Sequence, residues 1–121
     1  MAERKVLIVE DDVDFASTLA LPLQLRKHSV QVAHSGSEAI ALTTREAFDV
    51  CFLDIKMPGM SGIECLRKIR ALLPPGTQFI MMTGFREEAL LAEARQAGAR
   101  EVLLKPFKML EFLRCVEADA A

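Results

Sequence analysis

The sequence predicts a doubly wound α/β fold, in which helices cover both faces of a parallel β-sheet. Five short apolar segments alternate with five longer stretches whose apolar residues recur at helical spacing. The short segments are continuous apolar runs, as in strands that are buried on both faces. The chain has 121 residues, and we expect residues 1–121 to form one domain with one core.

The expected elements follow one another in strict alternation. We predict strands at 5–9 (KVLIV), 30–34 (VQVAH), 50–53 (VCFL), 78–82 (QFIMM) and 101–105 (EVLLK). We predict helices at 13–27, 36–47, 62–73, 86–97 and 108–118. Each strand is thus followed by a helix, which is the connection that parallel strands require.

Residues that begin or end helices occur at the expected boundaries. Ser35 or Gly36 can open the second helix, the Pro-Pro-Gly sequence at 74–76 ends the third, and Gly98 follows the fourth, where a left-handed cap is favoured. Pro22 lies inside the first helix. It removes one backbone hydrogen bond, so we expect a kink there.

Composition and charge exclude several classes of function. The net charge is −2, from 15 basic and 17 acidic residues, and no run of Lys or Arg indicates nucleic-acid binding by this chain. The apolar runs are too short to span a bilayer, and the first is followed at once by acidic residues, unlike a signal peptide. The three cysteines fit no metal-binding spacing. We therefore expect a cytoplasmic protein with reduced thiols and no membrane association.

Polar residues follow four of the five strands, at the edge of the sheet where ligands bind in such folds. They are Glu10, Asp11 and Asp12 after the first strand, Asp54 after the third, Thr83 and Gly84 after the fourth, and Lys105 and Pro106 at the end of the fifth. Each alone has a structural interpretation, as a helix cap, a turn residue or a solvated strand end. Their joint placement at one edge favours a site. His28 and His34 carry no predicted ligand role.

The expected site combines carboxylates with one fixed positive charge. Crowded carboxylates repel one another unless a cation lies among them, and short acidic side chains favour Mg²⁺ or Mn²⁺ over Zn²⁺. Lys105 would add an ammonium group, and Thr83 a hydroxyl group. These groups suit a phosphoryl group, and a carboxylate can also accept phosphoryl covalently.

Four motifs, VLIVEDD, VCFLDIKMPGMSG, MMTG and LLKPF, resemble the receiver domain of two-component response regulators, in order and at the spacing of that family. The resemblance covers residues 1 to about 118. It implies a flavodoxin-like sheet of five parallel strands in the order 2-1-3-4-5, flanked by five helices.

The resemblance also implies roles for single residues. Asp54 matches the phosphoacceptor, and Asp11 and Asp12 match the acidic pair that holds Mg²⁺ together with Asp54. Lys56 matches the position whose backbone carbonyl completes the metal's protein ligands.

Further roles concern switching. Thr83 matches the hydroxyl residue that bonds phosphoryl and moves on activation. Lys105 matches the lysine that contacts phosphoryl, and the peptide bond between Lys105 and Pro106 matches a cis bond. Val102 stands where many members carry the Tyr or Phe that swings inward on activation, so the usual aromatic switch is missing.

The resemblance implies a phosphorylation-controlled switch rather than an enzyme, although the chain would promote its own phosphoryl transfer and slow autodephosphorylation. The expected partner is a sensor histidine kinase or a histidine phosphotransfer protein. The surface of residues 86–118 would serve a homodimer or an effector. The chain would be either a stand-alone receiver or the front of a longer regulator.

Three other functions fit less well. A haloacid-dehalogenase-like phosphatase needs a second Asp two residues after the first, where this chain has Lys56. A flavodoxin-like carrier needs a phosphate-binding loop after the first strand, where this chain has acidic residues. A phosphorylation-independent pseudo-receiver is disfavoured because every residue for phosphorylation is present.

Overall fold

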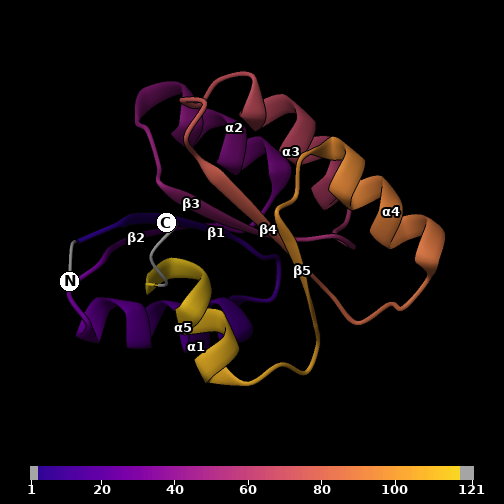
Figure 1. The fold of residues 1–121 in the computed structure, drawn as a ribbon. Helices are drawn as coiled ribbons and strands as arrows, with labels where there is room; N and C mark the ends of the chain where they lie inside the picture. The colour runs from indigo at the N-terminus through magenta and orange to yellow at the C-terminus, as the bar shows by residue number, and fades with distance from the viewer. Residues whose placement is uncertain (1–2, 118–121) are drawn as a thin grey trace.

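The computed structural model describes residues 3–117, which form a five-stranded parallel sheet with helices on both faces (Figure 1). The strands are β1 (Lys5–Val9), β2 (Ser29–Ala33), β3 (Val50–Asp54), β4 (Gln78–Thr83) and β5 (Glu101–Leu104). The helices are α1 (Val13–Leu25), α2 (Gly36–Arg45), α3 (Gly62–Arg70), α4 (Glu88–Ala97) and α5 (Met109–Glu117). The order in the sheet is β2-β1-β3-β4-β5, as the resemblance implied.

The sheet separates two apolar layers, because successive side chains of a strand point to opposite faces. Leu7 and Leu53 pack beneath α2, α3 and α4, whereas Ile8 and Phe52 pack against α1 and α5. Figure 1 shows the same division, with α1 and α5 together on one side of the sheet. The central strand β3 is buried along its whole length. A strand that is apolar on both faces is therefore needed here, as the sequence predicted.

Most differences from the predicted elements concern their ends. Helices α1, α2 and α3 end earlier than predicted, and α4 begins at Glu88 instead of residue 86. In α1 the cap is Arg26, and Lys27 has a positive φ of 70°, which turns the chain towards β2. The predicted end of the last helix, residue 118, lies outside the described residues. Pro22 does not end α1, which continues through it as one helix.

Gly98 confirms the predicted left-handed cap, with a φ of 121° after α4. Ser35 is the N-cap of α2, and its side chain accepts a hydrogen bond from the backbone of Glu38. No helix among residues 3–117 is long and apolar enough to cross a membrane.

Candidate functional site

Three carboxylates meet where β1 and β3 end. These strands are parallel neighbours, with Val9 opposite Leu53, so the residues that follow them reach the same edge. One oxygen each from Glu10, Asp11 and Asp54 lies within 4.8 Å of the others. Glu10 and Asp54 are buried, whereas Asp11 is exposed to solvent. Hard divalent cations prefer such a set of oxygen ligands, so the residues fit Mg²⁺ or Mn²⁺.

Lys105 supplies the positive charge next to this cluster. Its Nζ lies 2.9 Å from Oε1 of Glu10 and 3.3 Å from Oδ1 of Asp54. It also lies 4.5 Å from the centroid of the Phe15 ring, a cation–π contact that links the site to α1. Partial burial lowers the pKa of Lys105, but the hydrogen bond to Glu10 and the charge of Asp54 outweigh it, so the net pKa is raised. Lys105 therefore stays charged at neutral pH.

The pKa of Asp54 is strongly perturbed. Burial first, and then the negative charge of Glu10, raise this pKa from 3.8 to about 6, although Lys105 acts in the opposite direction. Asp11 adds a smaller repulsion. Without a bound cation, the negative charge of Asp54 is thus incompletely compensated. A divalent cation among the three carboxylates would compensate this negative charge.

Asp12 lies outside the cluster, contrary to the predicted acidic pair of Asp11 and Asp12. It is the N-cap of α1, and its Oδ1 accepts a hydrogen bond from the backbone N–H of Phe15 at 3.0 Å. Glu10 takes its place, since it is the first residue after β1 and reaches Lys105. The backbone N–H of Asp12 donates to Oε2 of Glu10 at 3.1 Å, which helps to hold this carboxylate.

The remaining predicted site residues lie around the same edge. Thr83 is the last residue of β4 and is 1 % exposed, and its hydroxyl oxygen accepts a hydrogen bond from the backbone N–H of Phe85 at 3.0 Å. The side chain of Lys56 is exposed, with its Nζ 4.8 Å from the centroid of the Phe85 ring. The bond between Lys105 and Pro106 is cis, as predicted. Val102 packs in the apolar layer beneath α2, α3 and α4.

Gly62 holds the start of α3 against the end of β3. A Cβ atom on Gly62 would lie 2.0 Å from the carbonyl oxygen of Asp54, so no larger residue fits without a shift of the backbone. Its N–H donates to the carbonyl of Ile55 at 2.8 Å. Sequence patterns alone assign no role to Gly62 or to Phe15. The only sequence signal for Gly62 is the Ser-Gly dipeptide at 61–62, at the predicted start of a helix.

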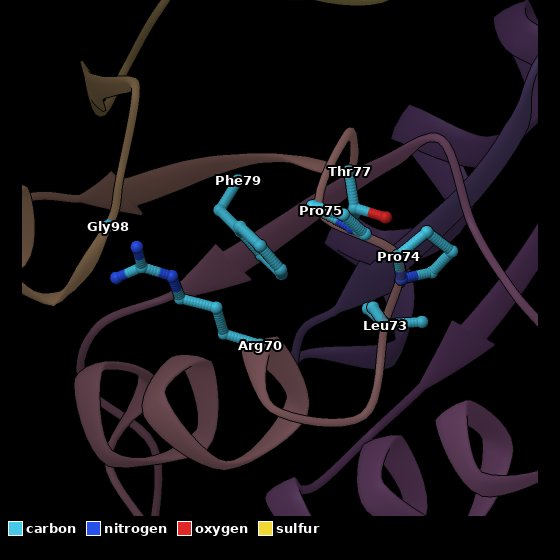
Figure 2. A pocket seen from close by; sticks show the side chains of 7 residues that line it. All are labelled: Arg70, Leu73, Pro74, Pro75, Thr77, Phe79 and Gly98. Carbon is cyan, nitrogen blue, oxygen red and sulfur yellow. The ribbon is translucent and has the colours of Figure 1, made fainter.

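The structure also contains a hollow at the opposite edge of the sheet, where β4 begins (Figure 2). It has a volume of about 440 Å³. The guanidinium group of Arg70 donates to the carbonyl of Ala97, and the hydroxyl of Thr77 donates to the carbonyl of Phe48. These polar groups are therefore already engaged in hydrogen bonds that stabilise the fold. The full lining is Arg70, Leu73, Pro74, Pro75, Thr77, Phe79 and Gly98.

Known proteins share both the sequence pattern and the fold. The family model of the response regulator receiver domain matches residues 6–117. The transcriptional regulatory protein ResD of Bacillus subtilis is 34% identical over 96% of this chain, which spans 48% of ResD. The autoinducer 2 sensor kinase/phosphatase LuxQ of Vibrio vulnificus is 36% identical over 88% of this chain, but only 12% of LuxQ is matched. The chain thus spans about half or less of these relatives.

Two solved structures are similar over almost the whole chain. A CheY-like receiver domain protein from Methanospirillum hungatei has a TM-score of 0.89 and 30% identity, and 95% of this chain and 91% of that one are covered. A response regulator from Burkholderia pseudomallei, solved with a phosphorylated aspartic acid and a calcium ion, has a TM-score of 0.88 and 28% identity, covering 96% and 68% of the chains. The five-stranded order, the acidic edge and these similarities lead to one assignment. The chain belongs to the response regulator receiver domain family.

Proposed function

We propose that this receiver domain accepts a phosphoryl group on Asp54 in a Mg²⁺-dependent reaction with a phosphohistidine of a partner protein. The partner would be a sensor histidine kinase or a histidine phosphotransfer protein. The observation that carries the proposal is the position of Asp54. It is the buried end of the central strand, it contacts Lys105, and one of its oxygens lies within 4.8 Å of an oxygen of each of two further carboxylates.

The chemistry divides the three carboxylates into two roles. Lys105 contacts both Glu10 and Asp54, but Glu10 also accepts a backbone hydrogen bond from Asp12, so both of its oxygens are engaged. An oxygen of Asp54 would form the new P–O bond while the P–N bond to the partner's histidine breaks and the imidazole leaves. Lys105 would neutralise charge on the phosphoryl oxygens, and the Thr83 hydroxyl would bond one of them.

Glu10 and Asp11, together with Asp54, would hold the metal, and the carbonyl of Lys56 would add a fourth protein ligand. Glu10 replaces Asp12 in this set because an oxygen of Glu10 lies in the cluster, whereas the side chain of Asp12 caps α1. The bound ion would offset negative charge on the carboxylates and the phosphoryl oxygens. A response regulator from Burkholderia pseudomallei was solved with a phosphorylated aspartic acid and a calcium ion, which supports a divalent cation in this proposal.

The finer features of the switch belong to the same proposal. Phosphorylation would change the surface formed by residues 86–118, through which a homodimer or an effector would respond. The chain would work in the cytoplasm, without direct contact with nucleic acid or membrane, and would lose its phosphoryl group slowly by autodephosphorylation. ResD is a transcriptional regulatory protein about twice as long as this chain, which supports a role in front of an effector.

The test is incubation of the chain with Mg²⁺ and a small phosphodonor, followed by mass spectrometry. We expect one phosphoryl mass gain in the parent and none in Asp54→Asn. Asp49→Asn is the matched control, because Asp49 precedes the opposite end of the same strand. An equal gain in the parent and in Asp54→Asn would contradict the assignment of Asp54. No gain in the parent would indicate a phosphorylation-independent receiver instead.

A further inference from the structure

His34 contacts the backbone of the acidic turn from the neighbouring strand. It follows the end of β2, and its Nδ1 lies 2.9 Å from the carbonyl oxygen of Glu10. A carbonyl oxygen only accepts hydrogen bonds, so Nδ1 carries the hydrogen and donates it. The backbone N–H of His34 in turn donates to Oε1 of Glu38 at 3.3 Å, in the first turn of α2. The imidazole thus donates to the acidic turn, while the backbone of the same residue is bonded to α2.

This hydrogen bond acts on the peptide unit that joins Glu10 to Asp11. A peptide unit is planar, so fixing its carbonyl oxygen restricts the rotation before and after it, ψ of Glu10 and φ of Asp11. On the other side, the N–H of Glu10 donates to the carbonyl of Ala33 at 2.9 Å. These rotations set the directions in which both acidic side chains leave the backbone. Their oxygens must converge with those of Asp54 within 4.8 Å.

We propose that His34 is a positioning residue for the divalent-cation site, which acts through the Glu10–Asp11 peptide unit without touching the ion. The inference rests on the proposed function, because that function assigns the cation to Glu10, Asp11 and Asp54. His34 orients two of the three side chains before the ion arrives. Preorganised ligands bind a metal more tightly than ligands that must first be ordered.

The side chain at position 34 can be varied to separate this role from simple packing. His34→Ala removes the donor. His34→Asn keeps an N–H group attached to Cγ, close to the place of Nδ1, and should restore the hydrogen bond to Glu10. Gln31→Ala is the matched control, since Gln31 is exposed on β2, the strand that His34 follows. Loss of one such hydrogen bond corresponds to about a threefold to tenfold weaker Mg²⁺ affinity.

The experiment is a Mg²⁺ titration by calorimetry and by the amide chemical shifts of Asp11 and Asp54, with thermal unfolding to check that each variant is folded. We expect weaker binding for His34→Ala and binding close to that of the parent for His34→Asn and Gln31→Ala. At saturating Mg²⁺, the rate of phosphorylation by a small phosphodonor should be nearly the same in all four proteins, because only the affinity for the ion changes.

Two results would overturn the inference. One is an unchanged Mg²⁺ affinity in His34→Ala, and the other is equal weakening in His34→Asn and His34→Ala. The proposed function is tested separately by Glu10→Gln and Asp11→Asn. If the parent binds Mg²⁺ and neither of these variants weakens it, the assigned ligand set is wrong. A parent that binds no Mg²⁺ overturns both proposals.

Discussion

Asp54 lies where the proposed site needs a buried negative charge, and this charge destabilises the fold. Its carboxylate is 7 % exposed at the end of β3, close to two other acidic side chains. Because its pKa is about 6, the carboxyl group is mostly ionised at neutral pH without a cation, although its surroundings favour the neutral form. The proposed site for a cation and a phosphoryl group therefore lowers the stability of the metal-free protein.

Because the pKa of Asp54 is raised, the stability of the metal-free protein should depend on pH. The folded protein holds the proton more tightly than the unfolded chain, so the contribution of Asp54 to stability is present below about pH 4 and is lost as the pH rises to about 6. Asp54→Asn cannot lose this proton. We expect it to be more stable than the parent by about 1–3 kcal/mol at pH 7.5 without metal, and no more stable near pH 4.

Urea unfolding of both proteins at the two pH values, with a chelator present, measures this difference. Addition of Mg²⁺ at pH 7.5 should stabilise the parent more than Asp54→Asn, because only the parent has the full set of carboxylates. A stability difference that is the same at both pH values would show that the titration of Asp54 is not its cause.

Asp11 and Asp12, adjacent in sequence, should respond to mutation with opposite signs. Asp12→Ala removes the N-cap of α1 and should lower the free energy of unfolding by about 0.5–2 kcal/mol. Asp11→Asn removes a repulsive charge near Asp54, so it should stabilise the metal-free protein while weakening Mg²⁺ binding. Urea unfolding in chelator checks both signs. Stabilisation by Asp12→Ala would mean that Asp12, too, is part of the crowded cluster.

The exchange of Asp12 for Glu10 shows what the sequence could establish about the site. The motif located the acidic turn, Asp54 and Lys105, because each follows a recognisable strand. It did not show which two of three consecutive acidic residues face the edge, since that depends on where β1 ends and where α1 begins. The contacts of Lys105 with Phe15, and of His34 with Glu10, join residues far apart in sequence. Neither contact has a local pattern from which it could be predicted.

At the scale of elements, the loops after β3 and β4 meet over the site. Lys56 comes from the first loop and Phe85 from the second, and their cation–π contact joins the two. The Phe85 ring is 46 % exposed although it is large and apolar. It carries no group that could orient a water molecule. The resemblance to the receiver family implies that the residues at these two positions influence the attack of water on the phosphorylated aspartate, so we expect a moderate to long lifetime of the phosphorylated form.

Shortening Phe85 should therefore shorten the lifetime of the phosphorylated form. Phe85→Ala removes the ring that lies against Lys56, and Phe85→Glu adds a group that can accept a hydrogen bond from water. We expect severalfold faster loss of phosphoryl in both, measured by mass spectrometry after removal of the phosphodonor. Arg86→Ala, at the next exposed position, is the control. If neither Phe85 variant changes the rate, the ring does not shield the phosphorylated residue.

The elements themselves were largely predictable, for a physical reason. A strand buried on both faces must be apolar throughout, and all five predicted strands are present within one residue at each end. Helix ends were less predictable, because they depend on capping bonds and on the turn that follows. In α4, Glu87 is the N-cap but makes no side-chain capping bond, so the sequence did not mark this start clearly.

At the scale of the whole molecule, Lys105 contacts Asp54 and connects the site to one side of the sheet. Lys105 lies on Phe15, which packs with α1 and α5, and the edge-on contact of Phe15 with Phe107 continues towards α5. Lys56 lies on Phe85, just before α4 on the other side. A change of charge at Asp54 can thus reach the layer of α1 and α5 through Lys105.

The last prediction concerns how the molecule switches when position 102 has no aromatic ring. Val102 is stiff about its first side-chain torsion and packs in the layer beneath α2, α3 and α4, so it cannot move between two distant pockets. Thr83 can still respond, since a charge-assisted hydrogen bond to phosphoryl contributes roughly 1.5–3 kcal/mol. That energy changes the population ratio of the two conformations of a loop by about tenfold to a hundredfold. Its hydroxyl now accepts a hydrogen bond from the N–H of Phe85, and turning it towards phosphoryl would release that loop.

We therefore expect activation to change the loop after β4 and the start of α4, while the strand around Val102 changes little. The measurement compares amide chemical shifts of the Mg²⁺ form with and without a beryllofluoride mimic of the phosphoryl group. Large shifts should be confined to residues 54–60 and 83–92. The backbone N–H of Lys105 donates to the carbonyl of Thr83 at 2.7 Å, so a small change at the end of β5 is consistent with this route. Shifts at 100–104 as large as those at 83–92 would instead mean that the surface of α4, β5 and α5 switches as one unit without the ring.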